Sequence, residues 1–164
     1  MKEEKFNHKK AMVKFQGEAV CKVDDKGRIV LPAAFRDAFA RAGETDMTMV
    51  VKRSVQGTCL NLFTAAAWEQ ESEKVLEGLD TELNPEHAAF WSKYNAGVHY
   101  VTPDGKLSRL NIPSELLSKV GITKEVVFAG VGHKIEIWSK ERRDAALMTD
   151  EVFQETAARL ARKR

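Results

Sequence analysis

The alternation of apolar and polar residues predicts a chain of short strands joined by tight turns, with helices between them. Residues 18–23 and 28–31 have the length and mixed alternation of strands, and residues 24–27 between them favour a turn. Pro32 suits the first turn of a helix, and Gly43 is a residue type that ends one. We therefore expect a hairpin that is followed directly by a helix.

The remaining pattern predicts four further strands and several helices. The strands are expected at residues 47–53, 60–63, 126–128 and 135–138, with turns at Gly57 and at residues 130–132. The helices are expected at residues 32–42, 113–120, 68–79, 84–94, 140–148 and 151–162. Thr64 and Ser139 stand where helix N-caps are expected, directly after two of the predicted strands.

The first hairpin pattern recurs in the second half of the chain. Residues 28–32 (RIVLP) correspond to residues 109–113 (RLNIP), an offset of 81 residues. Asp24 corresponds to Asp104 at an offset of 80, so the second copy has one more residue between its Asp and its Arg. The order of the elements is the same in both halves, which indicates an internal duplication.

One copy alone would be four short strands with about one helix. Its sheet would have unpaired edges and too little core to be stable in isolation. We therefore expect the two copies to pack together as pseudo-symmetric halves of one barrel. The expected organisation is a flexible tail at residues 1–13, a first repeat with its following helices at residues 14–94, and a second repeat with C-terminal helices at residues 95–164.

The loop before each repeated arginine contains the candidate functional residues. Arg28 has a planar guanidinium that can chelate a phosphate or the O6 and N7 atoms of guanine, and Lys26 adds a positive charge. Asp24, four residues before Arg28, can hold the guanidinium or accept hydrogen bonds from the turn, and Gly27 allows close approach to a ligand. The second loop supplies a similar set: Asp104, Lys106 and Arg109.

Composition and charge exclude several other classes of protein. The net charge of +2 is uninformative, but acidic residues gather in residues 65–90 while basic residues gather near the two loops and at the C-terminus. The chain has no apolar run long enough for a membrane span and no secretory signal, so we expect no membrane partner and a cytoplasmic location. Cys21 and Cys59 are expected to be reduced. The four histidines lack metal-ligand spacing, so we expect no cofactor, no metal and no enzymatic activity.

These motifs resemble the MraZ family of bacterial transcriptional regulators, which is related to the AbrB-like swapped-hairpin proteins. The matching features are F-x-G-E at residues 15–18, D-x-K-G-R-I-x-L-P at residues 24–32, and the degenerate block ending at residues 109–113. The resemblance covers about residues 13–160. It implies an α+β fold: a β-rich pseudo-symmetric barrel of two tandem AbrB-like repeats, each strand–loop–strand–helix–strand–strand, with peripheral helices.

The resemblance also implies a function. MraZ proteins bear a D-x-x-x-R motif in each half and bind direct repeats of double-stranded DNA upstream of the division and cell-wall gene cluster, including their own gene. They form homo-oligomeric closed rings, and a nucleoid-associated location follows. Asp24 and Arg28 fit the motif, whereas Asp104 lies five residues before Arg109. The second loop therefore either bulges by one residue or has lost the brace role of Asp104.

Two other interpretations use the same residues. An AbrB-like antitoxin or protein-interaction module would bind a protein partner without recognising an operator. Such modules typically have one copy and a disordered tail, whereas this chain has two copies and a tail predicted to be helical. Several aromatic residues could stack on bases, but their helical or strand spacing is more typical of a core or a subunit interface. They are Trp68, Phe90, Trp91, Tyr94 and Trp138.

Overall fold

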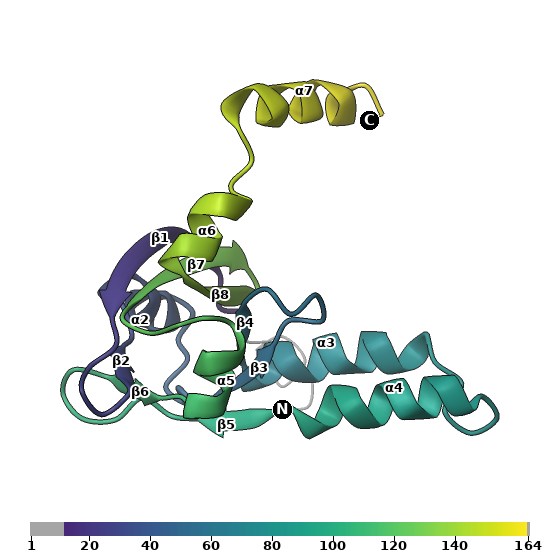
Figure 1. The fold of residues 1–164 in the computed structure, drawn as a ribbon, viewed down its shortest axis with the longest axis horizontal. Coiled ribbons are helices and arrows are strands. Elements are labelled where there is room, and N and C mark those ends of the chain that lie inside the picture. Colours follow the sequence, from purple (N-terminus) through teal and green to yellow (C-terminus); the bar gives the residue numbers. More distant parts are fainter. Residues whose placement is uncertain (1–11, 164) are drawn as a thin grey trace, which may run out of the picture.

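The computed structural model describes residues 12–163. Six strands form one antiparallel sheet in the order β1-β7-β8-β4-β3-β5, and two three-residue strands form a separate ribbon, β2-β6 (Figure 1). The strands are β1 (Phe15–Lys22), β2 (Arg28–Val30), β3 (Met49–Arg53), β4 (Leu60–Thr64), β5 (His99–Val101), β6 (Arg109–Asn111), β7 (Glu125–Gly132) and β8 (Lys134–Ser139).

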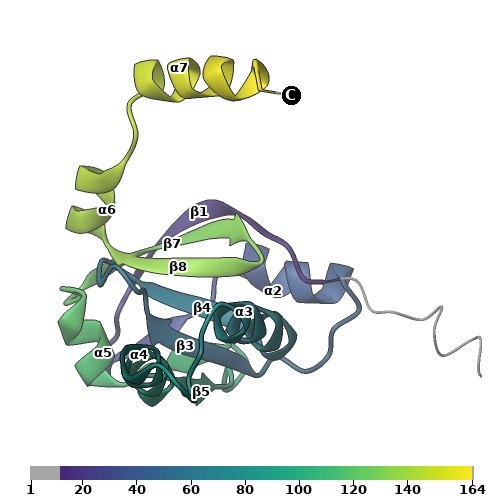
Figure 2. The same cartoon turned by 90° about the vertical axis from the view of Figure 1, so that its right-hand side faces the viewer.

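Within residues 12–163, six helices accompany these strands, and those of the two halves differ in how they pack. They are α2 (Ala33–Arg41), α3 (Ala65–Glu77), α4 (Pro85–Ala96), α5 (Ser114–Lys119), α6 (Lys140–Ala146) and α7 (Asp150–Ala161). The α3–α4 pair lies beside the sheet, whereas α7 stands away from the rest of the molecule in both views (Figures 1 and 2).

Replacing each strand of the large sheet by its counterpart in the other repeat gives the same strand order, read from the opposite end. The exchange converts β1 into β5, β7 into β3 and β8 into β4, so the sheet order reads the same from either end. Every pairing outside the β3–β4 and β7–β8 hairpins, β3 with β5 included, joins a strand of one copy to a strand of the other. The strands of the two copies therefore form one structural unit, as predicted.

The register places two residue pairs on the pseudo-twofold axis. Ile29 pairs with Leu110, its own counterpart at the offset of 81 residues. In the large sheet, Asn61 pairs with Glu136, its counterpart at an offset of 75. Since each repeat supplies an equivalent residue to these pairs, the duplication directly determines the register.

The core lies between the inner face of the sheet and the β2-β6 ribbon. Side chains alternate between the faces of a strand, and Ile29 and Leu110 are fully buried at the centre of the ribbon. They pack in one cluster with Phe35 and Phe39 of α2 and with Phe128 of β7. The predicted helix face is thus confirmed, because both α2 phenylalanines are at most 2% exposed.

A second apolar cluster lies on the outer face of the sheet beneath α3 and α4. Val50 and Phe63 project from the sheet, and Trp68 and Tyr94 cover them from the helices. The Trp68 and Tyr94 rings stack with centroids 5.6 Å apart. These aromatic residues therefore belong to the packing of the chain, as their spacing indicated.

The mixed α+β class and the two helix N-caps are as predicted. The Thr64 hydroxyl accepts a hydrogen bond from the Ala67 amide at 3.0 Å, and the Ser139 hydroxyl accepts one from the Arg142 amide at 3.1 Å. The closed barrel is not found: within residues 12–163, β1 and β5 are the two ends of the sheet and do not pair with each other. The β2-β6 ribbon covers the inner face instead of extending the sheet.

Three further expectations, on one turn, the N-terminal tail and the repeat boundary, have different outcomes. The turn predicted at residues 130–132 is wrong, because β7 continues to Gly132 and pairs along its length with β1. Most of the predicted tail, residues 1–13, lies outside the described residues, but Val13 is buried in the core. The division at residues 94 and 95 falls inside α4.

Gly130 is required for the close approach of β1 to β7. A Cβ atom at this position would lie 2.5 Å from the backbone nitrogen of Gln16 and 2.6 Å from the backbone carbon of Phe15. We expect Gly130→Ala to lower the free energy of unfolding by about 1–3 kcal/mol, because backbone atoms must move. Denaturant unfolding measures this, with Gly78→Ala as the control, since its nearest contact is an ordinary 3.6 Å. Equal stability of both variants would contradict the assignment.

Candidate nucleic-acid interface

The outer face of the β2-β6 ribbon brings the two repeated arginines together. Ile29 and Leu110 point into the core, so their strand neighbours point to the opposite face. That face carries Arg28 and Val30 from β2 and Arg109 and Asn111 from β6. Arg28 pairs with Asn111 and Arg109 pairs with Val30, so the arginines are diagonal neighbours, typically about 7–8 Å apart in such a pair.

The Asp24 side chain organises the first loop. One carboxylate oxygen accepts hydrogen bonds from the backbone amides of Lys26 at 2.9 Å and Arg28 at 2.8 Å. The other accepts one from the Arg28 Nε atom at 3.0 Å, and both side chains remain about one-third exposed. Gly27 has a φ of +78°, which a residue with a Cβ atom rarely adopts. Asp24 therefore performs both tasks predicted for it, holding the guanidinium and capping the turn.

These contacts lower the pKa of the Asp24 carboxyl below its ordinary value. The largest contribution is the hydrogen bond from the Arg28 backbone amide, and the Lys26 amide and the Arg28 guanidinium add to it. A carboxyl group whose pKa is lower in the folded state stabilises that state at neutral pH. That stabilisation is lost as the pH falls through the folded-state pKa.

The second loop is closed by its backbone. The Asp104 amide donates to the Arg109 carbonyl oxygen at 2.9 Å, and the Arg109 amide donates to the Asp104 carbonyl oxygen at 2.9 Å. The extra residue is accommodated by Ser108, whose φ of +53° lies in the left-handed region. Within the described part of the chain, no side-chain hydrogen bond joins Asp104 to Arg109. Both possibilities left open by the sequence therefore apply: the loop has a different shape and lacks the side-chain brace.

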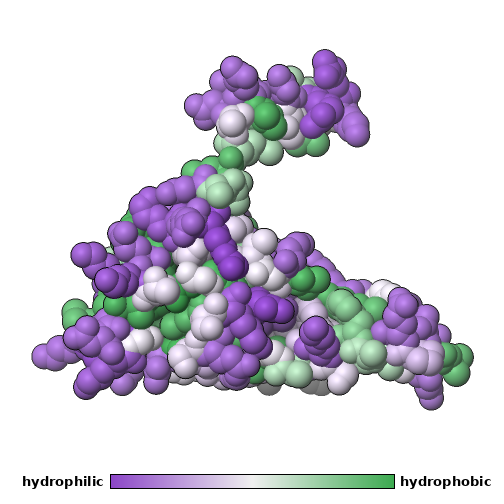
Figure 3. All heavy atoms as spheres, viewed as in Figure 1, coloured by the Kyte–Doolittle hydropathy of each residue, from purple (hydrophilic) through white to green (hydrophobic). Residues whose placement is uncertain are grey.

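The cations of the second loop have no ion-pair partner within the part of the chain that the structure describes. Among residues 12–163, neither Arg109 nor the exposed Lys106 has a carboxylate within 4.0 Å. In the first loop, Arg28 is paired with Asp24, whereas Lys26 has no carboxylate partner in the described part of the chain. The end of the molecule where the loops project is mainly hydrophilic in Figure 3. The ribbon face and its loops thus carry two adjacent arginines and two lysines, and of these only Arg28 is paired with a carboxylate among the described residues. This excess of positive charge favours an anionic ligand at this face.

The shared face of Arg28 and Arg109 could not be read from either loop separately. The two motifs lie 81 residues apart, and only the pairing of β2 with β6 makes them neighbours. Val30 and Asn111 join the same face, and neither was a candidate from sequence. The offset itself was the available signal, because an antiparallel pair of equivalent strands places equivalent residues symmetrically about the axis.

Fold and loops together define a class of duplicated α+β chains that carry one basic hairpin loop per repeat. The family model described as "MraZ protein, putative antitoxin-like" matches residues 14–84 and 96–163, one segment for each repeat. The chain belongs to the MraZ family.

Among the described residues, no helix is both long and apolar enough to span a membrane.

Several relatives match most of the chain, and each is named "Transcriptional regulator MraZ". The protein of Bacteroides thetaiotaomicron is 32% identical over 142 residues, which cover 87% of this chain and 88% of the relative. That of Saccharopolyspora erythraea is 40% identical over 128 residues, 78% of this chain and 82% of the relative. That of Stenotrophomonas maltophilia is 32% identical over 133 residues, 81% and 87% of the two chains.

We predict that the pKa of Asp24 stays below its ordinary value when the Arg28 guanidinium is removed. In Arg28→Ala the backbone amides still donate to the carboxylate, and the Arg28 amide is the largest cause of the shift. An NMR titration of the Asp24 carboxyl in the wild type and the variant measures this. A return to the ordinary pKa in the variant would show that the guanidinium, and not the turn, holds the carboxylate.

Proposed function

We propose that this protein is a sequence-specific DNA-binding transcriptional regulator that uses the outer face of the β2-β6 ribbon as its contact surface. The observation that carries the proposal is the joint position of Arg28 and Arg109 on that face. The names of the relatives agree with a regulatory function. A regulator of this kind acts in the cytoplasm at the nucleoid.

The dimensions of the ribbon suit the major groove of DNA. That groove admits a two-stranded β-ribbon, and an arginine there can form paired hydrogen bonds with guanine O6 and N7. Arg28 is held by Asp24 in a fixed direction, so less side-chain freedom is lost on binding. Lys26 and Lys106 lie in the loops beside the ribbon, where they suit contacts with phosphates.

Because the two loops differ in structure, the two ends of the proposed contact surface are not equivalent. A perfectly symmetric ribbon would read a palindrome, whereas one braced and one unbraced arginine read the two sides differently. Arg28 is assigned most of the base recognition, and Arg109 with Lys106 adds affinity, while the role of Asp104 is limited to closing its loop. Copies in the same orientation then require operator elements in the same orientation, which are direct repeats.

A homo-oligomeric closed ring is the assembly that fits such an operator. One ribbon contacts only a few base pairs, so a single chain binds weakly. Linked copies gain affinity through their effective concentration when the elements are correctly spaced. We place the operator upstream of the division and cell-wall gene cluster, including the gene for this protein. The competing function, an antitoxin-like module that binds a protein, predicts no dependence on DNA sequence.

Arg28→Ala is expected to abolish sequence-specific binding to DNA from upstream of the protein's own gene. The loss per site is roughly 5- to 160-fold in affinity, since one paired arginine–guanine contact contributes about 1–3 kcal/mol. The Asp24 hydrogen bonds to backbone amides do not involve the guanidinium, so the fold is retained. Gel-shift titration measures affinity, and circular dichroism checks folding.

Lys74→Ala provides the matched control, because it removes an exposed cation from α3, far along the chain from both loops. Arg109→Ala is expected to weaken binding to operator and to unrelated DNA more evenly than Arg28→Ala does. Normal operator binding by Arg28→Ala would refute the proposed contact surface.

Affinity is expected to rise steeply with the number of correctly spaced repeats in the probe. Binding to one, two and four repeats by gel shift measures this, and probes with half a helical turn inserted between repeats are the control. A salt titration of the same complexes counts the phosphate contacts from its slope. Equal affinity for one and several repeats would contradict the role of linked copies.

A further inference from the structure

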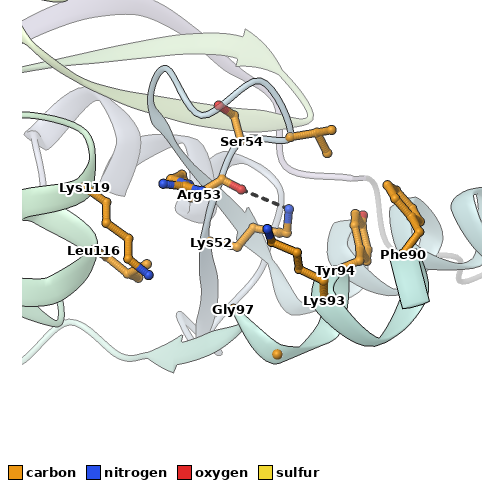
Figure 4. Close-up of a pocket in the computed structure, with 11 residues that line it drawn as sticks. Lys52, Arg53, Ser54, Phe90, Lys93, Tyr94, Gly97, Leu116 and Lys119 are labelled. Carbon is orange, nitrogen blue, oxygen red and sulfur yellow. Dashed lines mark hydrogen bonds between the residues drawn. The ribbon is translucent and has the colours of Figure 1, made fainter. Parts of the chain in front are cut away.

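A hollow of about 440 Å³ lies between the β3–β4 hairpin, α4 and α5 (Figure 4). This volume is within the range of sites that bind small molecules. Apolar groups line one part of the hollow, among them Val55 of the hairpin, Phe90 of α4 and Leu116 of α5. None of the described residues that line it belongs to the β2-β6 ribbon or to the two arginine loops. The hollow is therefore a separate feature from the proposed DNA-contact surface.

Within the described part of the chain, this hollow is lined by four cations and no carboxylate. The cations are Lys52, Arg53, Lys93 and Lys119. The Lys119 ammonium is paired with Glu115 at 3.0 Å, and the other three have no carboxylate within 4.0 Å among residues 12–163. Three separate elements, β3, α4 and α5, thus bring positive charge to one concave surface. Such an arrangement favours an anion with more than one negative charge.

Lys52 is the one cation of the hollow that is buried, with 6% of its surface exposed. Its strand neighbours Val50 and Val51 are fully buried, so the position belongs to an otherwise apolar strand. The Lys52 ammonium donates to the Arg53 carbonyl oxygen at 3.0 Å and lies 4.4 Å from the Tyr94 ring centroid. An ammonium has three donors, so further donors remain for a ligand.

A charge at this position costs free energy in the absence of a ligand. Burial and the nearby positive charge of Lys134 lower the pKa of Lys52, and the negative charge of Glu71 offsets them only in part. An apolar side chain of similar length would fit the same strand without this cost. An anion in the hollow would stabilise the charged form of Lys52. The buried ammonium is therefore better explained by binding than by packing.

Phe90 provides a flat apolar wall beside these cations. Its ring stacks on the Tyr94 ring with centroids 5.9 Å apart and an interplanar angle of 26°. Phe90 is nevertheless 41% exposed, so one face of its ring is covered and the opposite face is open. Figure 4 shows Phe90 and Tyr94 side by side on α4, with Lys93 on the same helix. A planar group can stack on the open face.

The charge and the shape of the hollow together indicate the class of ligand. A single carboxylate brings one negative charge, which is too little for three cations without partners. Phosphate groups bring several negative charges and many acceptor oxygens in a small volume, and both lysine and arginine bind them well. The open ring of Phe90 adds a preference for a planar heterocycle, since bases stack on aromatic side chains.

We propose that this hollow binds a small organic phosphate of the nucleoside diphosphate class, with at least two phosphate groups and a planar ring. Lys52, Arg53 and Lys93 hold the phosphates, and the ring of the ligand lies on Phe90. The proposal goes beyond DNA binding and involves no ribbon residue. Either proposal can therefore fail without the other.

Three probes test which parts of a ligand the hollow recognises. ADP, pyrophosphate and adenosine are titrated into the full-length protein by isothermal titration calorimetry in phosphate-free buffer. A chelator is included, because a divalent cation would neutralise the phosphates. ADP is expected to bind most tightly, since it alone has both phosphates and a ring. Pyrophosphate is expected to bind roughly fivefold or more weakly than ADP, as expected for the loss of one stacked base.

Three variants locate the site. Lys52→Met and Lys93→Ala are expected to weaken the binding of ADP and pyrophosphate roughly tenfold or more, because each removes a charged hydrogen-bond donor. Phe90→Ala is expected to weaken ADP binding and leave pyrophosphate binding unchanged. Lys52→Met is also expected to keep or raise the thermal stability, because it replaces a buried charge with an apolar side chain. Circular dichroism confirms that each variant is folded.

Two further variants serve as controls. Lys74→Ala removes an exposed cation of α3 that does not line the hollow. Arg28→Ala removes a cation of the ribbon, the other surface with an excess of positive charge. Both are expected to bind ADP as tightly as the wild type does. A loss of ADP affinity in either control equal to that in Lys93→Ala would show diffuse attraction of an anion and overturn the proposal.

Four other results would also overturn it. The first is a wild-type protein that does not bind ADP, and the second is equal affinity for ADP and pyrophosphate, which indicates a site for bare phosphate groups. The third is a Lys52→Met variant that loses stability and keeps its ADP affinity, which indicates a purely structural lysine. The fourth is a Lys93→Ala variant that loses self-association in light scattering and keeps its ADP affinity, which indicates a surface between copies of the chain.

Discussion

The antiparallel pairing of β2 with β6 joins the core of this protein to its proposed DNA-contact surface. Ile29 and Leu110 are fully buried on the inner side of the ribbon, and their burial fixes which residues face outward. Each strand is three residues long and comes from a different repeat, so neither repeat can form the ribbon alone. Hydrophobic burial at the pseudo-twofold axis therefore positions Arg28 and Arg109 on the outer face.

The two halves share an architecture and differ where ligands would bind. In the first loop the Asp24 carboxylate binds two backbone amides and the Arg28 guanidinium. In the second loop the backbone of Asp104 and Arg109 closes the turn, and Ser108 takes a left-handed conformation. One inserted residue is enough to exchange a side-chain brace for a backbone closure, and among residues 12–163 no carboxylate lies within 4.0 Å of the Arg109 guanidinium.

The helices after each repeat differ for a similar reason. In the first half, stacked aromatic rings hold α4 against α3, and their burial stabilises the pair within the chain. In the second half, α6 is held to the sheet by Arg143, whose Nε atom lies 3.1 Å from Glu18, and α7 has no buried residue. The same architecture thus gives one half a closed surface and the other half an exposed amphipathic helix.

The sequence alone determined the duplication, most strands and helices, the N-caps at Thr64 and Ser139, and the brace between Asp24 and Arg28, because these depend on local spacing and hydrogen bonding. Only the tertiary structure decided which strands pair across the repeats. It replaced the expected closed barrel with an open sheet and a separate ribbon, and it extended β7 through Gly130, where β1 approaches too closely for a side chain. These features depend on packing between distant segments, which local patterns do not encode.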